Sequence, residues 1–91
     1  MKNPFNSFDA IYCINLPDRT DRWNKALVEF NKLEINPTRI DGVIYSESKD
    51  KRRNAWVGCR LAHAECINRS IQLNHKNCLI FEDDIEFFFQ I

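Results

Sequence analysis

Apolar and polar positions follow two different periods along this chain, and the change between them predicts its secondary structure. Residues 10–16 (AIYCINL) form a nearly continuous apolar run of β-rich types, typical of a strand in a sheet that is covered on both faces. From Arg19 to Glu34, apolar side chains instead recur three and four residues apart, which predicts an amphipathic helix. Asp18 or Thr20 can cap the start of this helix, and Asn36-Pro37 is expected to stop it.

The pattern of the remaining residues predicts that strands and helices continue to alternate. Residues 38–42 indicate a short strand that runs into a loop, and residues 44–57 a polar loop. A second helix is expected over about 58–74, followed by an apolar strand at 77–81. The residues expected on the packed face of this helix are Cys59, Ala62, His63, Cys66, Ile67, Ser70 and Ile71. Strands that alternate with helices predict an α/β fold with a parallel sheet, for which we expect the strand order 2-1-3.

Composition and charge narrow the class of protein. The 91 residues suffice for one small domain, 1–91. Thirteen basic and thirteen acidic residues cancel, so no strong field draws the chain to nucleic acid or to an anionic membrane. No apolar stretch is long enough for a transmembrane segment or a signal peptide, and we expect a cytoplasmic protein. The four cysteines lack a CxxC pair, which favours free thiols over a structural zinc site or a disulfide framework.

Three consecutive carboxylates, Glu82, Asp83 and Asp84, follow the last predicted strand. Alternation along a strand would place Glu82 and Asp84 on one face and Asp83 on the other. Carboxylates so close together repel one another, and a divalent cation removes that penalty. Hard cations such as Mg²⁺ or Mn²⁺ prefer carboxylate oxygens and bridge well to a diphosphate. The triplet is therefore a candidate metal site, although such a cluster can also be a solvated turn.

Other polar residues are expected at the same edge of the sheet. Ligands of open α/β sheets bind beyond the carboxyl ends of the strands, where the strand order reverses. Asn15 and Leu16 lie at that end of the first strand, and Asp41 is placed like the acid that holds a ribose hydroxyl in dinucleotide folds. Arg19 and Arg22 lie one turn apart at the start of the first helix, where they can meet phosphate oxygens.

Each of these candidates also has a structural interpretation. The two arginines can form salt bridges at the helix start with Asp18 and Asp21, and Asp41 can belong to a simple turn. His63 can contact a phosphate or a metal, or be a hydrogen-bonded residue on the packed face of its helix. Trp23 fits the packing pattern of the first helix. The basic cluster 49–53 is either a solvated loop or a mobile loop on the acceptor or phosphate side.

The order of these motifs resembles glycosyltransferase family 25, which includes lipooligosaccharide sugar transferases and procollagen galactosyltransferases. The matching segments are 11–16 (IYCINL), 18–23 (DRTDRW), 39–42 (RIDG), 58–63 (GCRLAH) and 79–84 (LIFEDD). They occur in the family's order and at similar spacing, and they cover most of the chain. The family often has Ser where this chain has Ala62.

The resemblance implies a GT-A-like, Rossmann-like three-layer fold with a short parallel sheet and two main helices. It also implies transfer of a hexose, galactose or glucose, from a UDP-sugar donor to a glycan, lipooligosaccharide or glycosylated acceptor. The manganese or magnesium motif falls on Glu82, Asp83 and Asp84. Donor contacts fall on Asn15, Leu16, Arg19, Arg22, Asp41 and Asp83.

Family members continue well past the acidic motif, so we expect the acceptor half to be missing here and no general base can be named. The chain alone is then expected to be weak or inactive, and its apolar end, 86–91, to favour self-association. Two other functions remain open. The chain can be a truncated, non-catalytic module that binds a nucleotide-sugar or a metal, or an unrelated α/β interaction domain.

Overall fold

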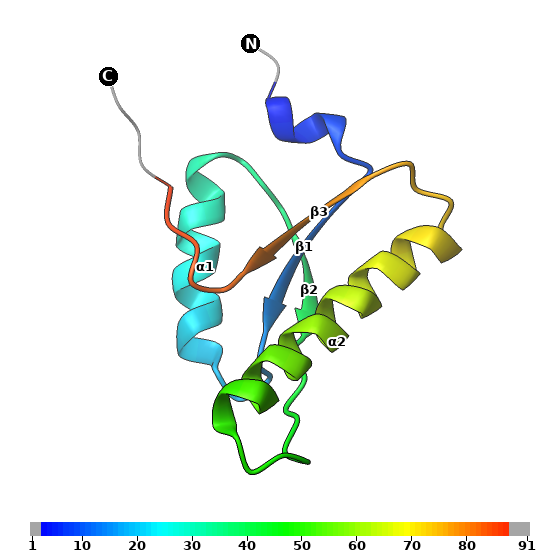
Figure 1. Ribbon diagram of the computed structural model, residues 1–91. Coiled ribbons are helices and arrows are strands. Elements are labelled where there is room, and N and C mark those ends of the chain that lie inside the picture. Colours follow the sequence, from blue (N-terminus) through cyan, green and yellow to red (C-terminus); the bar gives the residue numbers. More distant parts are fainter. Residues whose placement is uncertain (1–2, 88–91) are drawn as a thin grey trace.

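Three parallel strands form a sheet in the order β2-β1-β3, as predicted (Figure 1). The computed structural model describes residues 3–87. Strand β1 (Ala10–Asn15) is central and pairs in parallel with β2 (Thr38–Asp41) on one side and β3 (Cys78–Glu82) on the other. A short 3-10 helix, η1 (Pro4–Ser7), precedes the sheet. The α/β class and the parallel topology are thus confirmed.

One helix covers each face of the sheet, which explains why β1 is a continuous apolar run (Figure 1). Helix α2 (Lys51–Gln72) lies over a core that contains Tyr12, Ile14 and Ile40. Helix α1 (Thr20–Lys32) lies over the opposite core, where Cys13 packs with Ala26, Phe30 and Ile35. Successive residues of β1 therefore enter different cores.

The ends of α1 differ from the prediction. Its N-cap is Arg19, and neither Asp18 nor Thr20 caps it with a side chain. The helix ends at Lys32, before Asn36-Pro37, because Glu34 adopts a left-handed conformation with φ 55°. The backbone N–H of Ile35 then donates to the Phe30 carbonyl oxygen at 3.0 Å, which closes the helix end.

Helix α2 begins at Lys51, seven residues before the predicted start, so the prediction of a loop over 44–57 is wrong for 51–57. Asp50 caps the helix by accepting hydrogen bonds from the backbone N–H groups of Arg52 (2.9 Å) and Arg53 (3.3 Å). The basic cluster thus spans the N-terminus of a helix. Three cations there oppose the helix dipole, which is why the sequence pattern suggested a loop.

The packed face of α2 consists of small residues spaced four apart: Gly58, Ala62, Cys66 and Ser70 are buried. The prediction that Ile67 and Ile71 share this face is wrong, since they are 48% and 65% exposed. Small side chains let the helix backbone approach the sheet closely, and the larger apolar residues remain on the flank. The helix ends at Gln72, close to the expected position 74.

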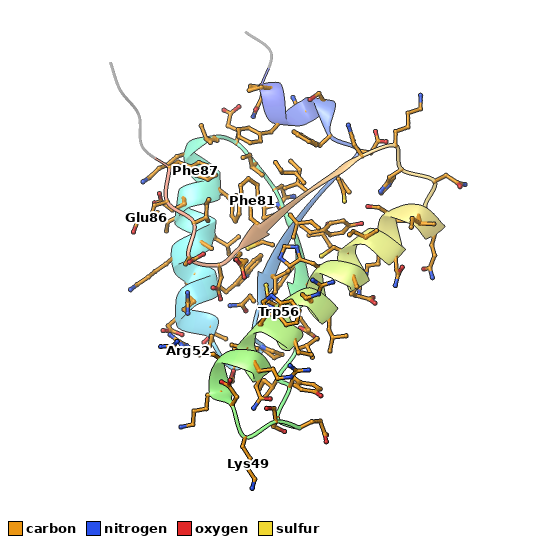
Figure 2. The ribbon with its side chains drawn as sticks, in the orientation of Figure 1. Lys49, Arg52, Trp56, Phe81, Glu86 and Phe87 are labelled. Carbon is orange, nitrogen blue, oxygen red and sulfur yellow. The ribbon has the colours of Figure 1, made fainter. Side chains whose placement is uncertain are left out.

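Aromatic side chains fill the α1-side core near the C-terminal end of the described chain. Phe81 and Phe87 lie beside α1, and each packs edge-on against Phe30, with ring centroids 5.3 and 5.9 Å away (Figure 2). Trp23 also packs against this core, as predicted. Residues 88–91 of the apolar end that was expected to favour self-association lie outside the described residues. No helix among residues 3–87 is long and apolar enough to cross a membrane.

Candidate functional site

A cavity of about 360 Å³ opens at the carboxyl end of the sheet, between the start of α1 and the first half of α2. This size lies within the usual range for small-molecule pockets. Its lining residues are Ile14, Leu16, Arg19, Arg22, Gly42, Val43, Ala55, Gly58, Cys59, Ala62, Glu82, Asp83 and Asp84. Six of the residues predicted from the sequence therefore meet in one cavity: Leu16, Arg19, Arg22, Glu82, Asp83 and Asp84.

Asn15 lies behind the cavity wall and connects the elements around it. Its side chain is buried, and Nδ2 donates to the Arg19 carbonyl oxygen at 3.0 Å and to Asp83 Oδ2 at 2.8 Å. Its Oδ1 accepts from Arg39 Nε at 3.0 Å. Asn15 thus ties the end of β1 to α1, to β2 and to the acidic triplet.

The first two carboxylates of the triplet point to opposite sides of the sheet, as strand alternation predicts. Glu82 accepts a hydrogen bond from the thiol of Cys59 on α2. Asp83 points toward α1, where Oδ1 lies 3.2 Å from Arg22 Nε and Oδ2 accepts from Asn15. Strand β3 ends at Glu82, so Asp84 lies in the following turn, where it is exposed and lines the cavity.

The two arginines have different partners. Arg19 forms a bidentate pair with Asp21, with Nε–Oδ1 and Nη2–Oδ2 distances of 3.0 and 3.1 Å, which is the predicted salt-bridged helix start. This guanidinium lowers the pKa of Asp21 to about 2. Arg22 instead pairs with Asp83 from a distant part of the chain.

Asp41 does not line this cavity. Its side chain is 70% exposed and forms a salt bridge with Arg39 on the same strand. Arg39 was not among the site residues predicted from the sequence. Its guanidinium donates hydrogen bonds to the side-chain oxygen and the carbonyl oxygen of Asn15, and it lies 5.9 Å from the Trp23 ring centre. Its role depends on contacts between β2, β1 and α1, for which no local sequence signal exists.

Cys59 is the other residue that sequence reasoning missed. It is a free, half-buried thiol on the α2 wall, and its Sγ donates to Glu82 Oε1 at 3.4 Å. Burial, followed by the hydrogen bond with Glu82, raises its pKa. One donor atom each from Cys59, His63 and Glu82 lie within 4.8 Å of one another. The signal in the sequence was the spacing of Cys59 and His63, one helical turn apart.

The amino-acid sequence of this chain is similar to those of known proteins. Residues 8–90 match the family model described as glycosyltransferase family 25 (LPS biosynthesis protein). A protein of Anopheles gambiae described as "Glycosyltransferase 25 family member" is 28% identical over an alignment 102 positions long, and this alignment covers 89% of this chain and 17% of that protein. No solved structure matches the chain. Because the family model spans nearly its whole length, this chain belongs to glycosyltransferase family 25.

Proposed function

We propose that this chain provides a donor site for glycosyl transfer, in which the cavity holds the diphosphate of a nucleotide-sugar together with a divalent cation. The observation that carries the proposal is that Arg19 and Arg22 line the same cavity as Glu82 and Asp84. A cationic wall suits phosphate oxygens, and a carboxylate wall suits the cation that bridges to them. Membership of family 25 and the position at the carboxyl ends of the strands support it.

The two arginines suit a diphosphate because each has accessible nitrogen atoms. Their side chains are 45% and 40% exposed, and their present partners are Asp21 and Asp83. Both lie at the N-terminal end of α1, where the helix dipole favours an anion. The guanidinium groups would bind and orient the diphosphate, and the protein's contribution there is positioning and charge stabilisation.

The carboxylates of the triplet differ in their fit to a cation. Both oxygens of Asp83 already have partners in Asn15 and Arg22, so we assign it to positioning the site. Glu82 and Asp84 are exposed and line the cavity, and their oxygens suit Mn²⁺ or Mg²⁺. A cation held by these two residues would neutralise charge on a departing nucleoside diphosphate.

The proposal for the substrates is supported by membership of the family rather than by the cavity. We propose a UDP-hexose as donor, with galactose or glucose as the sugar, and a glycan or glycosylated acceptor. The family description as an LPS biosynthesis protein supports a saccharide acceptor. The chain spans 17% of the length of the Anopheles gambiae relative, so the activity of the whole protein is part of this proposal.

Calorimetric titration of UDP and UDP-galactose, with and without Mn²⁺, tests the donor site. We expect Mn²⁺-dependent binding that Asp84→Asn weakens at least about tenfold, as loss of a cation ligand should. Glu47→Gln, which changes an exposed carboxylate outside the cavity, serves as the control and should bind like the parent. A folded chain that binds neither compound would overturn the proposal. Binding without any sugar transfer or donor hydrolysis would instead identify a non-catalytic donor-binding module.

A further inference from the structure

We propose that Cys59, His63 and Glu82 form a binding site for a thiophilic divalent transition metal, Zn²⁺ above all, on the α2 wall of the cavity. This inference goes beyond the donor site, because it concerns a softer metal and two side chains to which the donor proposal gives no role. It does not require the chain to bind a nucleotide. The donor atoms of the three side chains lie within 4.8 Å of one another.

The first argument is the geometry of α2. Cys59 and His63 are four residues apart on this helix, so their side chains project from consecutive turns of one face. A pair of ligands at this spacing on a helix is a recurrent way to chelate a metal. Glu82, at the end of β3, reaches the same point from the sheet and already accepts a hydrogen bond from Cys59. Two elements of regular structure therefore supply the three ligands.

The second argument is the chemistry of the donor set. One thiolate, one imidazole and one carboxylate match Zn²⁺, which is bound by sulfur, nitrogen and oxygen ligands in tetrahedral sites. In such sites neighbouring ligand atoms lie roughly 3.3–3.8 Å apart. The distance from Cys59 Sγ to Glu82 Oε1 is already 3.4 Å. The remaining separations, at most 4.8 Å, need only small side-chain rotations to close.

The third argument is access. Cys59 and His63 are half-buried and Glu82 is exposed, while Cys59 and Glu82 line the cavity. A metal can therefore enter through the cavity, and three protein ligands leave a fourth position for water or another ligand. Coordination replaces the thiol hydrogen of Cys59 with the metal, and the proton passes to solvent.

Sharing Glu82 links this site to the proposed donor site. Glu82 would hold a hard cation together with Asp84 in the donor site, and it would also bind Zn²⁺ together with Cys59 and His63. Zn²⁺ bound by the thiol would therefore withdraw Glu82 from Mn²⁺, and the two metals should compete. Added Zn²⁺ is then expected to weaken Mn²⁺-dependent donor binding in the parent chain but not in Cys59→Ser.

Cobalt titration of the chain tests the site directly. Co²⁺ adopts the geometry of zinc and gives a near-ultraviolet charge-transfer band when a thiolate binds it. We expect one Co²⁺ per chain with this band, and stoichiometric displacement by Zn²⁺. Cys59→Ser should abolish the band, and His63→Gln should weaken Co²⁺ binding at least about tenfold. Circular dichroism establishes that each variant is folded.

Matched controls come from the other half-buried cysteine and histidine, Cys78 and His75, which lie outside the cluster. Cys78→Ser and His75→Gln should each retain the band at full intensity. A folded parent chain without a thiolate band, or a band that survives in Cys59→Ser, overturns the proposal. Asp84→Asn separates the two sites, since it should weaken Mn²⁺-dependent donor binding at least about tenfold and leave the cobalt band in place. If the chain binds no donor, the cobalt band therefore still tests the metal site.

Discussion

At the scale of single residues, the acidic triplet divides into different roles. Asp83 has a side chain only 13% exposed, and it joins Arg22 of α1 to the buried Asn15 of β1. Asp84 is exposed and faces the cavity. Adjacent residues of the same chemistry therefore differ in what they stabilise. Asp83 holds the site together, and Asp84 is available to a ligand.

Replacing Asp83 should cost stability, and replacing Asp84 should not. Asp83→Ala removes a charge-assisted hydrogen bond and an ion pair, for which we expect a loss of about 1.5–3 kcal/mol in the free energy of unfolding. Asp84→Asn, at an exposed position, should change it by less than about 0.5 kcal/mol. Urea denaturation of both variants measures the difference. Equal losses in the two variants would show that Asp83 has no special structural role.

At the scale of elements, the close approach of α2 to the rest of the molecule rests on its small residues. A Cβ added at Gly58 would lie 2.3 Å from the carbonyl oxygen of Val43, far inside contact distance. Gly58 therefore lets the loop after β2 pass directly against the helix. Both residues line the cavity, so this contact also shapes the site.

Gly58→Ala should consequently destabilise the chain, although glycine to alanine within a helix ordinarily stabilises by about 1 kcal/mol. We expect a net loss of about 1–3 kcal/mol, because the Val43 backbone has to move. Ala64→Gly, at an exposed position of the same helix, measures the effect of helix propensity alone and should lower the free energy of unfolding by about 1 kcal/mol. Thermal or urea unfolding provides the measurement. A Gly58→Ala chain more stable than its parent would contradict the close contact between α2 and the Val43 backbone.

The elements also show what can be learned from the sequence. The strands and the body of α1 follow from apolar periodicity, because burial selects apolar residue types at the packed positions. The strand order was instead an expectation for a parallel α/β sheet, and the structure confirms it. The start of α2 was missed because its cap, Asp50, precedes three basic residues that oppose the dipole. Topology predicted that the triplet and the arginines meet. The pairing of Asp83 with Asn15 spans 68 residues and depends on packing that no local pattern encodes.

At the scale of the whole molecule, each face of the sheet has its own core, and each core contains one fully buried cysteine. Cys13 lies on the α1 side and Cys66 on the α2 side. Burial is the main cause that raises their thiol pKa values, to about 12 for Cys13 and about 11 for Cys66, from an ordinary value of 9.0. The ionisation of each thiol therefore depends on the burial of one core, the α1-side core for Cys13 and the α2-side core for Cys66.

These pKa values predict that the chain loses stability at alkaline pH. Above pH 9 the unfolded chain releases both thiol protons, whereas the folded chain keeps them until the pH approaches 11–12. The folded state then binds more protons, so the free energy of unfolding falls by about 1.4 kcal/mol per pH unit for each thiol. Cys13→Ala and Cys66→Ala should each make this slope, measured by urea denaturation, shallower by about that amount. Between about pH 6 and 7.5 the thiols stay protonated in both states, so parent and variants should share the same slope there. An alkaline slope that neither substitution changes would mean that the two thiols ionise alike in the folded and unfolded chains, and hence that neither core excludes water as the packing implies.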